Sequence, residues 1–99
     1  MKLYFPYKSD KPNKKFFIIT KDNKKVYFGQ AGASDFTQHK DPLRKQLYIN
    51  RHKKREEYLW NKSGIDTPSW WSRFLLWEEP TFELAYKKIK DKLTNWRVI

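Results

Sequence analysis

Residues 16–28 read Phe16-Phe17-Ile18-Ile19-Thr20-Lys21-Asp22-Asn23-Lys24-Lys25-Val26-Tyr27-Phe28. Two runs rich in aromatic and β-branched residues, 16–20 and 25–28, are separated by the polar residues 21–24, which suit a turn. This stretch therefore predicts an antiparallel β-hairpin. The preceding run Leu3-Tyr4-Phe5, which Pro6 ends, predicts a weaker first strand.

Three helical segments follow the strands. Asp41-Pro42 and Thr67-Pro68 combine a short capping side chain with a proline that has no amide to leave unbonded, and Pro80-Thr81 opens the last segment. The segment Trp70–Trp77 is apolar nearly all round and belongs in the interior. The sequence predicts a single α+β domain over residues 1–99, with a two- to three-stranded antiparallel sheet at the N-terminus packed by three helices. We expect the strands within residues 1–30, a loop over 31–41, and helices at about 42–59, 68–78 and 81–96.

The composition limits the class of protein. The 99 residues are 38% hydrophobic and include five Trp, six Tyr and seven Phe, which is enough for a packed core and excludes long disorder. The absence of Cys excludes a disulfide scaffold, a thiolate zinc site and a cysteine nucleophile. No apolar run approaches the roughly 18 residues of a membrane span, and the first residues do not resemble a signal peptide. We therefore expect a soluble intracellular protein that does not bind membranes.

The charge is strongly positive and unevenly placed. Lys and Arg number 22 against 11 Asp and Glu, a net charge of +11, and residues 1–62 hold 16 of the basic residues and 6 of the acidic ones. A field of this sign attracts nucleic acid or an acidic protein. Seventeen of the basic residues are Lys, however, and runs of Lys also form ordinary solvated surfaces.

Arginines gather on one stripe of the first long helix. At 100° per residue, Arg44, Arg51 and Arg55 fall within about 40° of one another. An apolar arc flanks them, made of Leu43, Leu47 and Tyr58 on one side and Tyr48 and Leu59 on the other. A guanidinium in such an arc needs an anion, because an unpaired buried charge costs several kcal/mol.

Two partners are open for these arginines. One is a carboxylate of this chain, with Asp35, Asp41 and Glu57 as candidates. The other is the phosphate of a bound nucleic acid, with tyrosines as stacking faces beside the arginines. Under the second interpretation the contact residues are Arg44, Tyr48, Arg51, Arg55, Lys40 and Lys45. Lys45 and Lys53 lie off the arc, where side chains are expected to be solvated.

The loop before this helix is rich in polar residues. Asp35, His39, Asp41, His52 and Glu57 predict a polar brace, in which hydrogen bonds tie the loop to the helix. His and Asp side chains also bind metals, but no established ligand spacing is present. We therefore predict no metal, no cofactor and no catalytic residue here.

The chain from about Lys25 to Leu93 resembles a family of short, functionally uncharacterised proteins encoded mainly by large DNA viruses of eukaryotes. The resemblance implies a viral source and a self-contained domain, and no activity. It departs at the amino-terminal strands and at Thr67–Trp71. The residues that carry it are Phe28-Gly29, Gly32-Ala33-Ser34-Asp35-Phe36-Thr37, His39-Lys40-Asp41, Arg44-Lys45, Tyr48, Arg51-His52, Glu57, Ser72-Arg73-Phe74-Leu75-Leu76-Trp77 and Pro80-Thr81.

The predicted hairpin ends at Tyr27-Phe28-Gly29-Gln30 and is followed by an Arg on the next helix. This arrangement shows a weaker resemblance to the opening of the GIY-YIG nuclease fold. That resemblance implies a phosphodiester-cleaving role for Tyr27 and Arg44, with Glu83 or Glu57 as the metal ligand. The first strand has Phe and Ile where the fold has Gly-Ile-Tyr, so one of its tyrosines is missing.

Three functions follow as hypotheses. The first is a small, basic, viral-type module that binds nucleic acid through phosphate contacts. The second is a structural or interaction protein, such as a minor virion component, with an acidic protein partner and with Trp70, Trp71 and Trp77 partly at the interface. The third is a degenerate or active nuclease. The sequence does not fix the oligomeric state.

Overall fold

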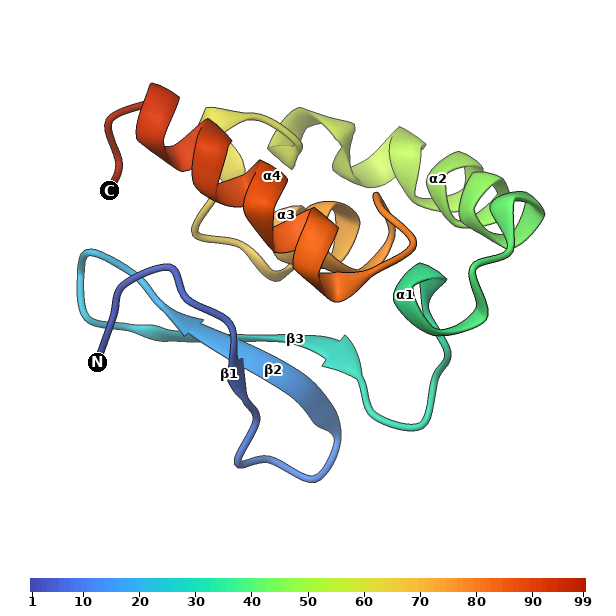
Figure 1. The fold of residues 1–99 in the computed structure, drawn as a ribbon, viewed down its shortest axis with the longest axis horizontal. Helices are drawn as coiled ribbons and strands as arrows, with labels where there is room; N and C mark the ends of the chain where they lie inside the picture. The colour runs from blue at the N-terminus through green and yellow to red at the C-terminus, as the bar shows by residue number, and fades with distance from the viewer.

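The predicted hairpin forms the centre of an antiparallel sheet in the computed structural model, which describes residues 1–99. The strand order is β1-β2-β3, and Phe16 lies opposite Phe28 in the central pair. All the helices lie on one side of this sheet (Figure 1). The elements are β1 (Tyr7–Lys8), β2 (Lys14–Ile19), β3 (Lys25–Gln30), α1 (Phe36–His39), α2 (Pro42–Glu56), the 3₁₀ turns η1 (Glu57–Leu59) and η2 (Lys62–Gly64), α3 (Pro68–Trp71), the π-helical turn η3 (Ser72–Leu76) and α4 (Phe82–Asn95). The α+β prediction, with a three-stranded N-terminal sheet, is confirmed.

Alternation along the strands separates two faces of the sheet. Ile18 and Phe28 point to the helices and join the core, where the Phe28 ring packs 5.9 Å from that of Trp71. Phe17 and Tyr27 point to the opposite face, with ring centroids 5.4 Å apart. Consecutive residues of β2 and β3 therefore point to opposite faces of the sheet, one toward the helices and the next away from them.

The first strand begins later than predicted. Leu3-Tyr4-Phe5 is not a strand, because Tyr4 has a left-handed backbone with φ of 53° and its side chain is buried. The Tyr4 hydroxyl donates to Asp66 Oδ1 at 2.6 Å. Burial, together with this bond, raises the pKa of Tyr4 to about 12. Strand pairing starts after Pro6, at Tyr7, which lies opposite Phe17.

The helix starts follow their predicted caps. The side chains of Asp41, Thr67 and Thr81 accept hydrogen bonds from the amides of Leu43, Trp70 and Leu84. The segment predicted as one helix over 68–78 is α3 followed by the π-helical turn η3, and the predicted loop over 31–41 contains the short helix α1. The loop prediction was wrong there because Asp35 and Gln38 form a reciprocal capping box.

The tryptophan-rich segment is the centre of the core. Trp70, Trp71 and Leu75 are fully buried, and they pack under Ala85, Ile89 and Leu93 of α4. The Trp71 indole donates to the carbonyl oxygen of Ile65 at 2.8 Å. Trp70 and Trp71 are therefore core residues, and the prediction that they contribute to an interface is wrong.

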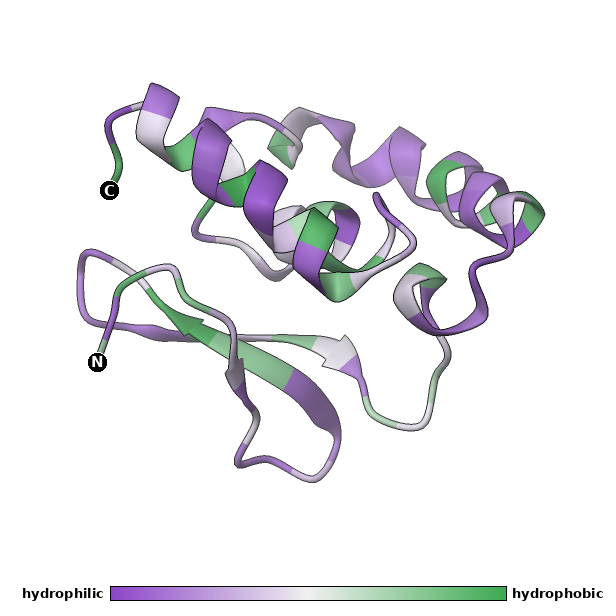
Figure 2. Cartoon of the chain, in the orientation of Figure 1, coloured by the Kyte–Doolittle hydropathy of each residue, from purple (hydrophilic) through white to green (hydrophobic).

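Hydropathy differs between the two long helices. Along α2 most positions are hydrophilic, whereas α4 alternates between hydrophobic and hydrophilic stretches (Figure 2). Both helices are too short and too polar to cross a membrane, and the same holds for every other helix of the structure.

Candidate functional site

The orientation of α2 is set by one aromatic stack. Tyr48 is the only buried side chain of this helix, and its ring lies between those of Trp77 and His52. The centroid distances are 4.4 Å to Trp77, with an interplanar angle of 6°, and 4.2 Å to His52, with an angle of 27°. Such stacked pairs contribute roughly 0.5–1.5 kcal/mol beyond their buried area. The stack fixes which face of α2 is turned to the core.

The apolar arc predicted for α2 is not a buried face. Leu43 and Leu47 are 66% and 55% exposed, and Tyr58 is also exposed. The inward positions are instead held by Tyr48, His52 and the half-buried Lys45. The expectation that Lys45 is solvated was therefore wrong, because this side chain packs beside Phe36 and reaches Glu78.

The arginines of the stripe are free cations. Arg44, Arg51 and Arg55 are exposed, and none of them makes an ion pair or a side-chain hydrogen bond within the protein. Their candidate internal partners are engaged elsewhere: Asp35 pairs with Lys15, Asp41 caps α2, and Glu57 lies 3.6 Å from Lys53. The internal arginine–carboxylate network is therefore absent.

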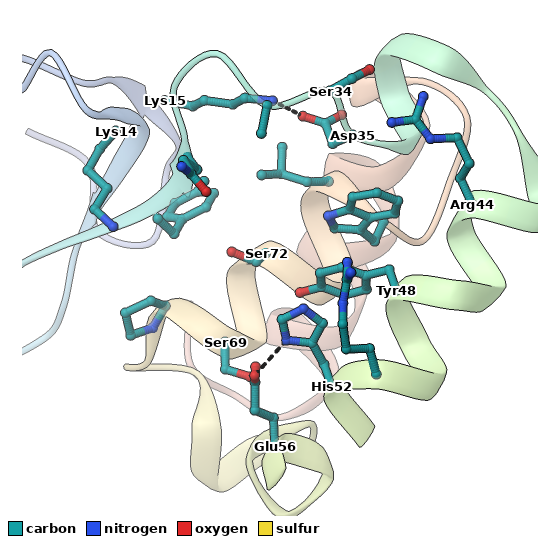
Figure 3. A pocket seen from close by; sticks show the side chains of 18 of the residues that line it. Lys14, Lys15, Ser34, Asp35, Arg44, Tyr48, His52, Glu56, Ser69 and Ser72 are labelled. Atoms are coloured by element: carbon teal, nitrogen blue, oxygen red, sulfur yellow. Dashed lines mark hydrogen bonds and ion pairs between the residues drawn. The ribbon is translucent and has the colours of Figure 1, made fainter. Parts of the chain in front are cut away.

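A groove of about 710 Å³ runs between α2, the end of β3 and the α3–η3 segment. Arg44 and Arg51 line it from α2, while Lys14 lines it from β2. Figure 3 shows Lys14 on one side, Arg44 and Tyr48 on the other, and Ser72 between them. Arg55 does not line the groove. The structure thus brings two of the three stripe arginines to a concave surface, with a further cation on the opposite wall.

A chain of hydrogen bonds crosses one end of the groove. His52 Nδ1 donates to Glu56 Oε2 at 2.7 Å, and the Ser69 hydroxyl donates to Glu56 Oε1 at 2.6 Å. The Ser69 oxygen in turn accepts from the Trp60 indole at 2.9 Å. Burial raises the pKa of Glu56, but the bonds from Ser69 and His52 outweigh it and leave this pKa below its ordinary value. The chain joins α2 to α3.

The carboxylate that pairs with His52 belongs to Glu56, a residue that the sequence analysis did not single out. Glu57 points to solvent, and the partner of His52 is Glu56. The i, i+4 spacing of His52 and Glu56 on a helix is the signal that identifies the pair, because side chains four residues apart lie on the same face. Since a carboxylate accepts only, Nδ1 must carry the proton, and Nε2 of neutral His52 is left as an acceptor.

Polar residues of the loop before α2 make hydrogen bonds within the loop and to β2. The Asp35 carboxylate is buried, accepts from the Thr37 amide at 3.0 Å and pairs with Lys15 Nζ at 2.5 Å. His39 Nδ1 accepts from the Asp41 amide at 3.0 Å. Asp35 thus ties the loop to β2, and His39 fixes the turn that leads into α2.

Two lysines proposed as nucleic-acid contacts are held by carbonyl oxygens. Lys40 Nζ donates to the carbonyl of Pro80 at 2.6 Å, and Lys45 Nζ donates to that of Glu78 at 2.7 Å. Neither residue lines the groove. Both join the α1–α2 region to the segment before α4.

The residues that the nuclease resemblance implied are not brought together. Tyr27 lies on the face of the sheet away from the helices, where its hydroxyl donates to Asp10 Oδ1 at 2.6 Å, whereas Arg44 lines the groove on the helix side. Glu83 and Glu57 line no part of this groove. The structure also holds no group of three or more His, Asp or Glu side chains arranged to bind a metal ion.

His39 predicts a pH-dependent stability. Burial lowers its pKa from the ordinary 6.5, and the neighbouring Arg44 lowers it further, against the carboxylates of Asp41 and Asp35. Protonation would turn Nδ1 into a donor and break its bond with the Asp41 amide. Because the folded pKa is below the unfolded one, this contribution is fully present above pH 6.5 and is lost as the pH falls through the folded value.

The variant His39→Asn tests this, because an Asn Oδ1 can accept the Asp41 amide without titrating. We expect urea midpoints measured at about pH 7.5 and about pH 5.5 to differ more for the wild-type protein than for His39→Asn. Equal losses in the two proteins would assign the pH dependence to groups other than His39.

Residues 7–52, from β1 to the middle of α2, match a family of unknown function, DUF5754. This stretch of the chain is similar to that family and includes Lys14, Arg44, Tyr48, Arg51 and His52 of the groove. Neither a curated protein nor a solved structure matches the chain.

Proposed function

We propose that this protein binds nucleic acid through phosphate contacts made by Arg44 and Arg51, with Lys14 on the opposite wall of the groove. The observation that carries the proposal is that the stripe arginines are exposed and have no anionic partner in the protein. The net charge of +11 supplies the long-range attraction.

The chemistry of arginine supports a phosphate ligand. A planar guanidinium makes two parallel hydrogen bonds to a phosphate and loses less hydration than an ammonium group. Arg44 and Arg51 are seven residues apart on α2, a rise of about 10.5 Å, so they contact different phosphates. Backbone contacts of this kind hold the ligand without reading its bases, so we propose no sequence specificity.

The test is the salt dependence of binding in a charge-matched pair of triple variants. We expect Arg44→Gln/Arg51→Gln/Arg55→Gln to lower the slope of log K against log salt by about 0.9 for each phosphate that the variant no longer neutralises. The control Lys21→Gln/Lys62→Gln/Lys87→Gln removes three exposed charges outside the groove and should change the slope far less. Fluorescence anisotropy with labelled DNA and RNA measures both. Equal reductions of the slope in the two variants would mean that only the net charge matters.

An acidic protein partner is a second candidate, and the exposed leucines favour it. Leu43 and Leu47 are more than half exposed beside Arg44 on α2, and an apolar and arginine-rich surface suits a protein interface. A structural role in a virus particle belongs to this candidate. Leu43→Ser/Leu47→Ser would then abolish capture of the partner, and capture would survive about 200 mM salt, which weakens phosphate binding steeply.

A further inference from the structure

The groove is small relative to a nucleic-acid duplex. Its volume of about 710 Å³ lies within the roughly 300–1,000 Å³ typical of sites that enclose a small molecule. One or two nucleotides fit such a space. A duplex is too wide to enter this space, because its major groove alone is about 12 Å wide. Its bases also stay inside the stack, between the two backbones. Only an unpaired strand can place its sugars and bases inside.

Three polar groups of the groove lining lack partners in the protein. The Ser72 hydroxyl, the Tyr48 hydroxyl and His52 Nε2 make no hydrogen bond within the chain, and none of them is closed off from solvent. Figure 3 shows the Tyr48 ring directed toward the interior, where Ser72 also lies, with His52 below them. Such groups can bond the polar edges of a base or the oxygens of a sugar, which an unpaired strand presents and a duplex keeps in its stack.

A second groove, of about 750 Å³, shares part of its lining with the first. Lys14, Lys15 and Asp35 line both grooves, so the Lys15–Asp35 ion pair stands between them. Lys8 and Lys11 also line the second groove, and the Lys11 ammonium lies 4.3 Å from the centroid of the Tyr27 ring. Its lining also includes two aromatic rings, Phe16 and Phe82, with centroids 5.3 Å apart. Cations that follow a backbone beside aromatic rings that stack on bases are the usual components of a single-strand site.

We infer that the two grooves form one path for a single strand of nucleic acid, which runs from Arg51 across the Lys15–Asp35 pair to Lys8 and Lys11. The phosphates lie against the lysines and arginines of the rim, and unpaired nucleotides enter the interior beside Ser72 and Tyr48. This inference rests on the proposed function, and it adds that the ligand is single-stranded and that its site is longer than the α2 stripe.

The experiment compares three probes by fluorescence anisotropy: an oligothymidylate of about four nucleotides, one of about twelve, and the longer strand paired with its complement. The two lengths bracket the site sizes of single-strand modules. We expect the longer single strand to bind at least about tenfold more tightly than the duplex, a difference of about 1.4 kcal/mol. We expect Lys8→Gln/Lys11→Gln to weaken binding of the longer strand several-fold and to leave the shorter one unchanged. The control Lys21→Gln/Lys87→Gln removes the same charge outside both grooves.

The outcomes separate this inference from the proposed function. Equal or tighter binding of the duplex, still sensitive to Arg44→Gln/Arg51→Gln, would overturn the single-strand inference and leave the proposed function standing. An equal effect of Lys8→Gln/Lys11→Gln on both strand lengths would overturn the two-groove path. Absence of binding to all three probes at about 50 mM salt would overturn the proposed function as well.

Discussion

Replacing Gly64 with alanine is expected to destabilise the protein by more than about 4 kcal/mol, at the extreme of what single substitutions do. Gly64 ends the turn η2 and is buried. A Cβ atom at this position would lie 1.7 Å from the carbonyl oxygen of Leu59 and 2.5 Å from its carbonyl carbon. These are backbone atoms of η1, so no side-chain rotation can relieve the overlap. The connection between α2 and α3 would have to open.

Gly32→Ala is the matched control. Gly32 has a left-handed backbone with φ of +86°, but a Cβ atom there would have nothing within 4 Å. Its cost is conformational only, roughly 1–2 kcal/mol. Urea denaturation of both variants measures the difference. Similar midpoints for the two would show that η1 and η2 are not packed as closely as the structure has them.

Local sequence determines most of the strands and helix starts. The hairpin follows from the β-branched and aromatic runs on either side of Asn23, and the starts of α2 and α3 follow from side chains that cap helices beside a proline. Tyr4 was misplaced for a non-local reason. Its neighbours in sequence are apolar, as in a strand, but its hydroxyl bonds Asp66, which is 62 residues away. No window of sequence contains that contact.

The candidate site was only partly predictable for a similar reason. Helical spacing places Arg44, Arg51 and Arg55 on one stripe, but spacing alone does not tell which side of the helix is buried. Contacts with the segment between η3 and α4 decide it: Tyr48 stacks on Trp77, and Lys45 reaches the carbonyl of Glu78. The arginines therefore face solvent and the groove, although an apolar arc suggested the interior. Lys14 was not predicted at all, because it comes from the other wall.

Tyr48→Ala is expected to cost about 3–5 kcal/mol, the range for truncating a large buried aromatic side chain. Tyr48 supplies the central ring of the Trp77–Tyr48–His52 stack and is the only buried side chain of α2. Without the Tyr48 ring, α2 loses its main packing interaction. The exposed side of the helix, which carries the three arginines, makes no contact that could compensate for this loss. The denaturation midpoint should fall, and hydrogen exchange of the α2 amides should accelerate more than that of β2 and β3.

Tyr48→Phe separates the packing role of this residue from its role in the groove. The hydroxyl has no partner in the protein, so its loss should change the free energy of unfolding by less than about 0.5 kcal/mol. Burial raises the pKa of the phenol, so the hydroxyl keeps its proton at neutral pH and can donate to a ligand. If unpaired nucleotides enter the groove, Tyr48→Phe should weaken binding of single strands several-fold in an otherwise stable protein. Unchanged binding would mean that the ligand contacts only the rim of the groove. A large loss of stability would mean that the hydroxyl has a structural role. Together, Tyr48→Ala and Tyr48→Phe test whether Tyr48, which orients the arginines of α2 through its ring, also contacts the bound nucleic acid through its hydroxyl.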